Sequence, residues 1–356
     1  MGQVRACARL TAFLCLVTVF ALAKTKDRGK SIVEIESQAN SLYQQGKYPE
    51  AFAAFRHGAD LGSARSQALL GYMYRFGQGT APDSTQAFEW MSKAAEQGYA
   101  SAENVLGAMY QNGVGTVQDY AHALTWYAKA AQQGDPNAEH DLGFLYYKGL
   151  GTKQDYALAL AWFSRAAEQG LPEAENNLGG IYLKGLGAAV DLPRALLWFR
   201  KAADQGNPNA QYSLGSMYQM GLGTAQDYAM AIAWYRKAAE QGFAPAENDL
   251  GTMYSTGLGT TQDCALAFKL FNMAAQQGSS AAERNLGYMY MTGLGVAKDR
   301  AQAHEWLARA FDHGDEEAKE WLALADSQVS PQSLPDLATT FDTANEKSIH
   351  QETKSQ

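Results

Sequence analysis

The sequence predicts an all-α protein built as a stack of small helical units. A Leu-Gly pair recurs every 36 residues, and a Tyr follows three residues after each Gly. Within each period, apolar residues fall at helical spacing between Asp and Gly residues. A constant period of this length is typical of proteins in which each unit packs on its neighbours. The Leu residues that set the period are Leu70, Leu106, Leu142, Leu178, Leu214, Leu250 and Leu286.

The first 23 residues are predicted to be a secretory signal peptide. Arg5 and Arg9 precede an apolar run from Leu10 to Ala23, which ends in an Ala-Leu-Ala motif. This run is shorter than the roughly 20 residues that a membrane span needs, and the whole pattern is typical of a cleaved signal. We therefore expect export to the periplasm or the medium after cleavage near Ala23, with no membrane span in the mature chain. An uncleaved anchor is the alternative.

Composition argues against several classes of protein. Cleavage would remove Cys7 and Cys15 and leave only Cys264, so we expect no internal disulfide. The formal net charge is -8, and the chain has no runs of Lys or Arg. Such a chain is a poor ligand for nucleic acid, whose binding depends on neutralising phosphates.

One repeat, 135–170, shows how each unit should fold. Asp135 caps a first helix that has Pro at its first position, and Gly149 ends it by permitting a left-handed backbone. Asp155 caps a second helix, which closes at Gly170. The seven units are 63–98, 99–134, 135–170, 171–206, 207–242, 243–278 and 279–314, and each has the Asp cap of its second helix: Asp83, Asp119, Asp155, Asp191, Asp227, Asp263 and Asp299.

A column of large aromatic residues in the second helix is predicted to be core. Small Ala and Gly columns let the helices approach, and large side chains fill the space between them. A stripe of like residues at a structural period favours packing over ligand binding. The column reads Trp90, Trp126, Trp162, Trp198, Trp234, Leu270 and Trp306.

The repeated columns resemble the Sel-one-like repeat family, which is related to the tetratricopeptide repeats. They read A-x-x-x-L-G-x-x-Y-x-x-G-x-G, followed by D-[Y/L]-x-x-A-x-x-W-[Y/F]-x-x-A-A-x-x-G, over residues 63–314. The resemblance implies a right-handed α-solenoid of antiparallel helix pairs. It also implies that the first helices line the concave side, and that the protein acts as an adaptor in complex assembly, envelope processes or contact with host cells.

The flanking segments complete the expected domain organisation. Residues 24–37 are a linker or helix, and 38–62 form a shorter tetratricopeptide-like opening repeat. Residues 315–326 form a capping helix, because charged residues dominate its outer side. Residues 327–356 are polar and aperiodic, which predicts a disordered tail.

The expected binding face is a stripe of variable residues on the first helices. These columns lie two residues before, two after and five after each Leu, opposite the core. Amides bond to a partner's backbone and rings add contact area, so this composition favours protein or peptide binding. The predicted site is Asn104, His140, Phe144, Tyr147, Asn176, Tyr212, Asn248, Arg284 and Tyr288. An acidic column beside it would favour basic partners: Glu103, Glu139, Glu175, Glu247 and Glu283.

The sequence shows no catalytic constellation. The Gly-x-Gly loops lack the Gly-Lys of a phosphate-binding loop, and the six His residues occupy different columns. We predict no catalytic residue, no metal site, no cofactor and no enzymatic activity. Two alternatives stay open: β-lactam binding or hydrolysis, implied by cysteine-rich relatives whose Cys pairs this chain lacks, and binding of a cell-wall glycan by the aromatic residues of the groove.

Overall fold

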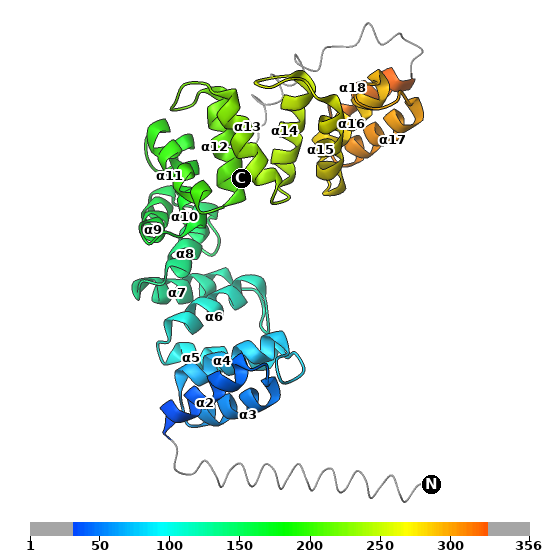
Figure 1. The fold of residues 1–356 in the computed structure, drawn as a ribbon. Helices are drawn as coiled ribbons and strands as arrows, with labels where there is room; N and C mark the ends of the chain where they lie inside the picture. Colours follow the sequence, from blue (N-terminus) through cyan, green and yellow to red (C-terminus); the bar gives the residue numbers. More distant parts are fainter. Residues whose placement is uncertain (1–30, 327–356) are drawn as a thin grey trace, which may run out of the picture. The chain divides into compact units, whose positions relative to one another are not determined.

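The computed structural model describes residues 31–326, which fold into seventeen α-helices without a strand (Figure 1). The predicted signal peptide (1–23) and the predicted disordered tail (327–356) lie outside the described residues, and both remain predictions. Among the helices that are described, none is long and apolar enough to cross a membrane. The all-α, helix-pair prediction is confirmed.

The helices form two compact units, the first ending at Ala138 and the second beginning at Glu139. In each unit, consecutive helices pack side by side (Figure 1). The first helix of each repeat, here called helix A, is α4 (Ala64–Phe76), α6 (Ala100–Asn112), α8 (Pro136–Lys148), α10 (Pro172–Lys184), α12 (Pro208–Met220), α14 (Ala244–Thr256) and α16 (Ser280–Thr292). The second, helix B, is α5 (Ser84–Glu96), α7 (Tyr120–Gln132), α9 (Tyr156–Glu168), α11 (Leu192–Asp204), α13 (Tyr228–Ala239), α15 (Cys264–Gln276) and α17 (Arg300–Asp312).

Three further helices flank the repeats. The pair α2 (Ile32–Gln44) and α3 (Tyr48–Asp60) precedes them, so helical structure begins before the expected opening repeat at residue 38. A capping box at Ser31 and Glu34 starts α2, because each side chain satisfies a backbone N–H of the first turn. The short helix α18 (Ala318–Asp326) follows the last repeat.

The Asp and Gly columns set the ends of the helices, as the sequence predicts. In every helix B, the capping Asp side chain accepts a hydrogen bond from a backbone N–H of the first turn. The backbone N–H of Asp155 also donates to the carbonyl of Tyr146 (2.9 Å), which closes the loop between the paired helices. Gly149 has a φ of 70°, a conformation that only glycine adopts in the described residues.

The core forms where helix B crosses the Leu-Gly pair of helix A. Phe163 is fully buried, and a Cβ added to Gly143 would lie 3.0 Å from its ring. The same contact recurs between Gly107 and Tyr127 and between Gly215 and Tyr235. The Gly column therefore exists because a large side chain of helix B, aromatic in five of the seven repeats, occupies the space of a side chain.

The prediction that the Trp column belongs to the core is only partly correct, because most of its members are partly buried side chains at the edge of the core. Within this column Trp234 and Leu270 are buried, and the other five residues are half-buried. The residue that follows each Trp is the one in the core, as Phe163 follows Trp162. The charged end of a Lys or Arg three residues further on lies 3.8–4.7 Å from the ring centre in all six Trp-containing repeats. The Trp ring therefore packs under a cation at the surface of helix B.

Candidate functional site

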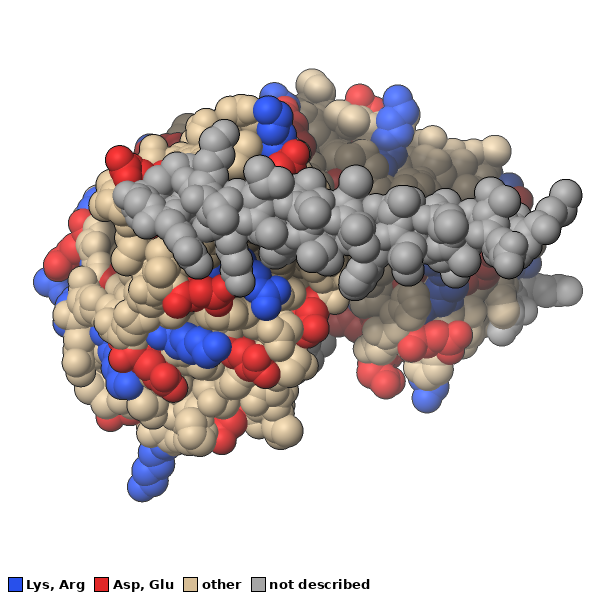
Figure 2. Space-filling view, turned by 90° about the horizontal axis from the view of Figure 1, so that it is seen from below, with Lys and Arg blue, Asp and Glu red and all other residues tan. Residues whose placement is uncertain are grey.

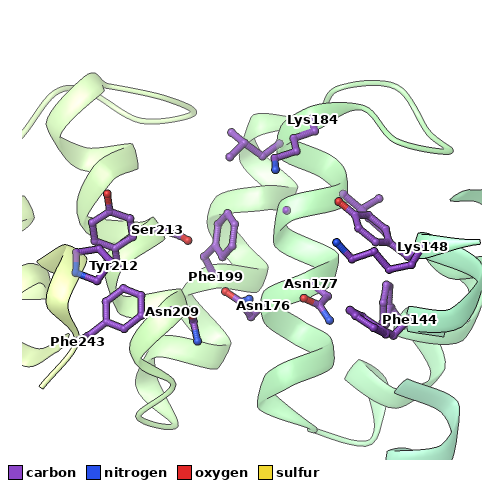
Figure 3. A pocket seen from close by; sticks show the side chains of 16 residues that line it. Phe144, Lys148, Asn176, Asn177, Lys184, Phe199, Asn209, Tyr212, Ser213 and Phe243 are labelled. Atoms are coloured by element: carbon purple, nitrogen blue, oxygen red, sulfur yellow. The ribbon is translucent and has the colours of Figure 1, made fainter. Parts of the chain in front are cut away.

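A groove of about 480 Å³ opens on the helix A surfaces of the second unit (Figure 3). Its lining comes from α8, α10 and α12, from the start of α14, and from buried rings of α9 and α11. The residues that define this helix-A groove are Phe144, Tyr147, Lys148, Asn176, Asn177, Gly180, Lys184, Asn209, Tyr212, Ser213 and Phe243, with Phe163 and Phe199 beneath them.

Aromatic rings form the two walls of the helix-A groove. Phe144 and Tyr147 stand on α8, and the Tyr147 ring lies 6.4 Å from Phe163. Burial raises the pKa of the Tyr147 hydroxyl above its usual range, so this group stays neutral. On the opposite wall, the rings of Tyr212 and Phe243 lie 5.6 Å apart. Figure 3 shows these walls on either side of the polar residues of α10.

The floor of the groove is formed by amide side chains and by a glycine, which has no side chain to fill the space above it. Asn176 and Asn177 of α10 lie between the walls (Figure 3). Gly180 lies one turn further along the same helix, and a Cβ added there would meet nothing within 4 Å. The space above Gly180 therefore contributes directly to the hollow.

A ladder of hydrogen bonds links neighbouring A helices and is interrupted at the groove. Its rungs join side chains 37 residues apart: His140 with Asn177 (3.0 Å), Tyr212 with Asp249 (3.0 Å) and Asn248 with Asn285 (2.9 Å). His140, Tyr212 and Asn248 belong to one repeat column, and the residue of that column between His140 and Tyr212 is Asn176. Its Oδ1 is buried and has no hydrogen-bond partner in the protein. A buried acceptor without a partner is uncommon in folded proteins. Asn104, in the same repeat column of the first unit, has the same unpartnered Oδ1, so the feature belongs to the column as well as to the groove.

The charge of the groove lining differs from that of the general surface. Figure 2 shows acidic and basic residues interspersed over the face turned toward the viewer, without a large field of one sign. In the helix-A groove, by contrast, the charged lining residues are Lys148 and Lys184, and no Asp or Glu lines it. The ammonium of Lys148 lies 5.5 Å from the centre of the Tyr147 ring. The groove thus combines aromatic walls, amides and two cations.

The structure brings together part of the predicted site. Phe144, Tyr147, Asn176 and Tyr212 all line the helix-A groove. His140 and Asn248 lie on the same helix surfaces but are engaged in the ladder. Asn104 belongs to the first unit, where its Oδ1 is buried without a protein partner.

The C-terminal helix and the residues before it cover two residues of the predicted binding face, and these two are therefore not part of the proposed site. Arg284 is 7% exposed and forms ion pairs with Asp315 (3.2 Å) and Glu317. Tyr288 is also buried, with its ring edge-on to Trp321 at 5.2 Å. The sequence predicts a capping helix over residues 315–326, but it does not show that this segment covers the two positions, as α18 and the residues before it do.

The acidic column does not form a surface for basic partners, which corrects that prediction. All five Glu residues are at most 4% exposed. Each accepts a hydrogen bond from a residue at the end of a helix B, for example Glu139 from Gln169 (2.8 Å) and Glu175 from Gln205 (2.7 Å). Burial raises the pKa of Glu103, Glu175 and Glu247, and the hydrogen bonds partly oppose this shift. The column therefore lies inside the junctions between repeats, where its carboxylates bond to side chains of the protein.

Sequence reasoning missed several residues of the groove. Lys148 and Lys184 share one column, six residues after the Leu, and the other repeats have uncharged residues there. The restriction of Lys to these two repeats was a signal in the sequence that could have pointed to the groove. Gly180 lies in a variable column, two residues after Leu178, but the void above it was not predictable from residue types. In the described part of the chain, no three His, Cys, Asp or Glu side chains gather closely enough to hold a metal ion.

A sequence model of the Sel1 repeat matches seven consecutive segments of the chain. They are residues 64–99, 100–135, 136–171, 172–207, 208–243, 244–279 and 280–315. These segments have the predicted period of 36 residues. No curated protein sequence shows significant similarity to the chain.

Two crystal structures are similar to the chain in both sequence and fold. One is a protective antigen present in uropathogenic Escherichia coli strains that displays an SLR fold, with 38% identity and a TM-score of 0.72. The match covers 83% of this chain and 64% of the antigen, so the chain spans less than two thirds of that protein. The other is a Sel1 repeat protein from Oxalobacter formigenes, with 32% identity and a TM-score of 0.69, covering 87% of this chain and 91% of that one.

Proposed function

Because this chain belongs to the Sel1 repeat family, whose members are generally protein-interaction scaffolds, we propose that it binds an extended segment of a partner protein in the helix-A groove. The proposed role is that of a non-enzymatic adaptor. The observation that carries the proposal is the open floor of the groove at Gly180.

Gly180 has no conformational reason to be glycine. It lies inside α10 and is not among the residues with positive φ. Glycine in a helix interior destabilises it by roughly 0.5–1 kcal/mol relative to Ala. In the same column, the preceding repeat has Phe144, so the fold accepts a large side chain at this position. The space above Gly180 is thus maintained at the expense of helix stability, as expected for a binding surface.

The rest of the groove suits a peptide in extended conformation. The aromatic walls provide apolar area, which supplies most of the favourable free energy in small interfaces. The amides of Asn176, Asn177 and Asn209 lie at the floor, where they can bond to backbone groups of a strand. An open groove lined by several repeats leaves a bound chain free to continue at both ends.

The test compares two substitutions at Gly180. We expect Gly180→Phe to fill the groove and abolish binding, whereas Gly180→Ala should retain it and raise stability by about 0.5–1 kcal/mol. The measurement is selection of short random peptides on the full-length immobilised protein, with circular dichroism to verify the fold. If the same peptides bind to the Gly180→Phe variant with unchanged affinity, the groove is not the binding site.

We also propose that the protein is exported, on the basis of its N-terminal sequence. Expression in a bacterium should yield a chain that begins just after Ala23, located in the periplasm or the medium. N-terminal sequencing of the fractionated protein measures this. An Ala23→Asp variant, which disrupts the small-residue motif, should keep its N-terminus. A wild-type chain that retains Met1 in the cytoplasmic fraction would contradict the proposal.

A further inference from the structure

We propose that a C-terminal segment of the chain itself, residues 334–341, docks in the helix-A groove and competes there with the partner segment. This segment lies outside the described residues. Such docking would regulate access to the groove. It rests on the proposed function in one respect, that the groove binds peptides.

The capping helix brings the chain onto the helix-A surface of the second unit, where α18 packs against α16 and α17 (Figure 1). Tyr288 of α16 occupies the repeat column of Gly180, and the ring of Trp321 lies edge-on to it at 5.2 Å. One turn earlier, Arg284 pairs with Asp315, which precedes α18, at 3.2 Å. The residues after the last repeat therefore already cover, in α16, columns that line the groove in α10.

The helix-A surface of α14, which lies between α16 and the groove, carries only small polar side chains in these columns. They are Asn248, Thr252, Ser255 and Thr256. The hydroxyls of Thr252 and Thr256 donate to backbone carbonyls of α14 itself, at 3.1 and 2.8 Å. None of the four side chains is a ring or an ion. A chain that leaves α18 can therefore cross close to α14 without meeting a bulky or charged side chain.

The segment is long enough to reach the groove. Four contacts between consecutive helices separate α16 from α12. Packed helices lie about 8–10 Å apart, so the two axes are at most about 40 Å from each other. Phe341 follows Asp326, the last residue of α18, by fifteen residues, which can span about 50 Å. Residues 334–341 can therefore reach the wall formed by Tyr212 and Phe243.

The composition of the segment suits the lining of the groove. Residues 327–356 are mainly polar, but Leu334, Leu337 and Phe341 place three large apolar side chains within eight positions. Burial of such side chains is favourable in proportion to the apolar area removed from water. The half-buried rings of the two walls offer apolar surface for this contact. No Asp or Glu lines the groove, so the acidic residues that adjoin Leu337 and Phe341 meet no like charge among the lining residues.

The first test measures the segment as a free peptide. We expect a labelled peptide of residues 330–345 to bind the full-length Leu334→Ser/Leu337→Ser/Phe341→Ser protein, here called the triple-Ser variant, because its own tail no longer competes. Adding Gly180→Phe to this variant should abolish binding. Fluorescence anisotropy measures the affinity, and circular dichroism verifies the helical fold of each variant.

The wild type should bind the same peptide at least about tenfold more weakly than the triple-Ser variant does. The reason is that a tethered tail acts at an effective concentration on the order of 1 mM, which exceeds a peptide Kd of about 0.1 mM by this factor. Equal affinity of the two proteins, absence of binding to the triple-Ser variant, or binding that ignores Gly180→Phe would each overturn the inference.

The matched control changes two apolar tail residues outside the segment. The Val329→Ser/Ile349→Ser variant should bind the free peptide as weakly as the wild type, and a gain equal to that of the triple-Ser variant would contradict the assignment to residues 334–341. The tail could also come from a second copy of the chain. Sedimentation at two protein concentrations distinguishes this case, because self-association that is lost in the triple-Ser variant would overturn docking within one chain.

Selection of random peptides on the triple-Ser variant separates this inference from the proposed function. Gly180-dependent binders from the library, together with a tail peptide that does not bind, would overturn the inference and leave the proposed function intact. A tail peptide that binds in a Gly180-dependent way, together with a library that yields no other such binder, would support the inference and overturn the proposed function.

Discussion

Gln67 and Gln211 occupy the same repeat column as the five buried Glu residues and show what that position requires. Each accepts a hydrogen bond from a Gln at the end of a helix B. Each also donates through Nε2 to a backbone carbonyl, of Ala59 and of Ala203 respectively, at 3.2 Å. At Glu247 the side chain has only acceptors. Its Oε2 is bonded to a Gln, but Oε1 is buried without a partner. The position therefore suits an amide better than a carboxylate.

We expect Glu247→Gln to stabilise the protein by about 1 kcal/mol at pH 7, because the new amide can donate to the carbonyl of Ala239, the repeat equivalent of Ala203. Burial raises the pKa of Glu247 above its ordinary value of 4.5. The folded state thus binds more protons than the unfolded state above pH 4.5, so stability falls as pH rises through that window. The variant loses this contribution. Urea denaturation at about pH 4 and pH 7 measures the difference.

The control for this prediction is Glu139→Gln. Glu139 forms an ion pair with Arg165 at 2.8 Å, which the substitution removes. This second variant should therefore gain no stability. The interpretation of the column fails if Glu247→Gln is less stable than the wild type at pH 7, or if its advantage is the same at both pH values.

At the scale of single residues, only part of the candidate site could be predicted from the sequence. Columns opposite the core identified Phe144 and Tyr147, since rings on a variable surface are an informative signal. The burial of the Glu column was not predicted, because carboxylates are usually exposed. The presence of Gln67 and Gln211 in that column was the available indication that it is a buried polar position between repeats. The void above Gly180 depends on what surrounds a missing side chain, which a sequence does not record.

At the scale of the helix, α15 departs from the other B helices. They carry a Trp with a Lys or Arg over its ring, whereas α15 has Leu270 and Met273 in those two positions. A cavity of about 190 Å³ lies there, lined also by Leu250 and Tyr254. The smaller Leu side chain leaves space that the indole fills elsewhere.

The double substitution Leu270→Trp/Met273→Lys should stabilise the protein by about 1 kcal/mol, because it restores the cation–ring pair of the other repeats. Thermal unfolding measures this change. Leu270→Trp alone should give part of the gain, and Met273→Lys alone should give none. A lower midpoint for the double variant would show that the cavity is too small for an indole and that the site is overpacked.

The helices themselves were predictable because their ends depend on local chemistry. The sequence predicts a helix between Asp155 and Gly170, and α9 runs from Tyr156 to Glu168. Asp caps and glycines act within a few residues, so they can be read without knowledge of the packing. The depth of burial could not be read in this way. Trp162 and Phe163 are adjacent apolar residues, and periodicity alone did not show which of them faces helix A.

At the scale of the whole molecule, the last repeat is closed by α18. Trp321 is 6% exposed and packs on Tyr288, while Arg284 pairs with Asp315 and Glu317. In a stack of repeats each unit contacts only its neighbours, so an end without a cap exposes apolar surface. The residues that line the groove in internal repeats are therefore used for capping in the final one.

We expect Trp321→Ala to destabilise α16–α18 by roughly 3–5 kcal/mol, because a large buried aromatic side chain is lost. The loss should remain local. Hydrogen exchange should quicken in α16 and α17, whereas α8, α10 and α12 keep their protection. The control is Lys319→Ala, at an exposed position of the same helix. Faster exchange throughout the second unit would contradict nearest-neighbour stability.

The unbroken period of the repeats also has a genetic consequence. The contact between the Leu-Gly pair and the following helix B recurs in every repeat. Recombination between repeats of the gene can therefore delete one repeat and still leave two repeats with matching packing surfaces next to each other. Loss of the unit that contains α10 and α11 would remove Asn176, Gly180 and Lys184 together. The shortened protein would fold but would lack the groove. The groove is thus easier to lose or remodel than the architecture that supports it.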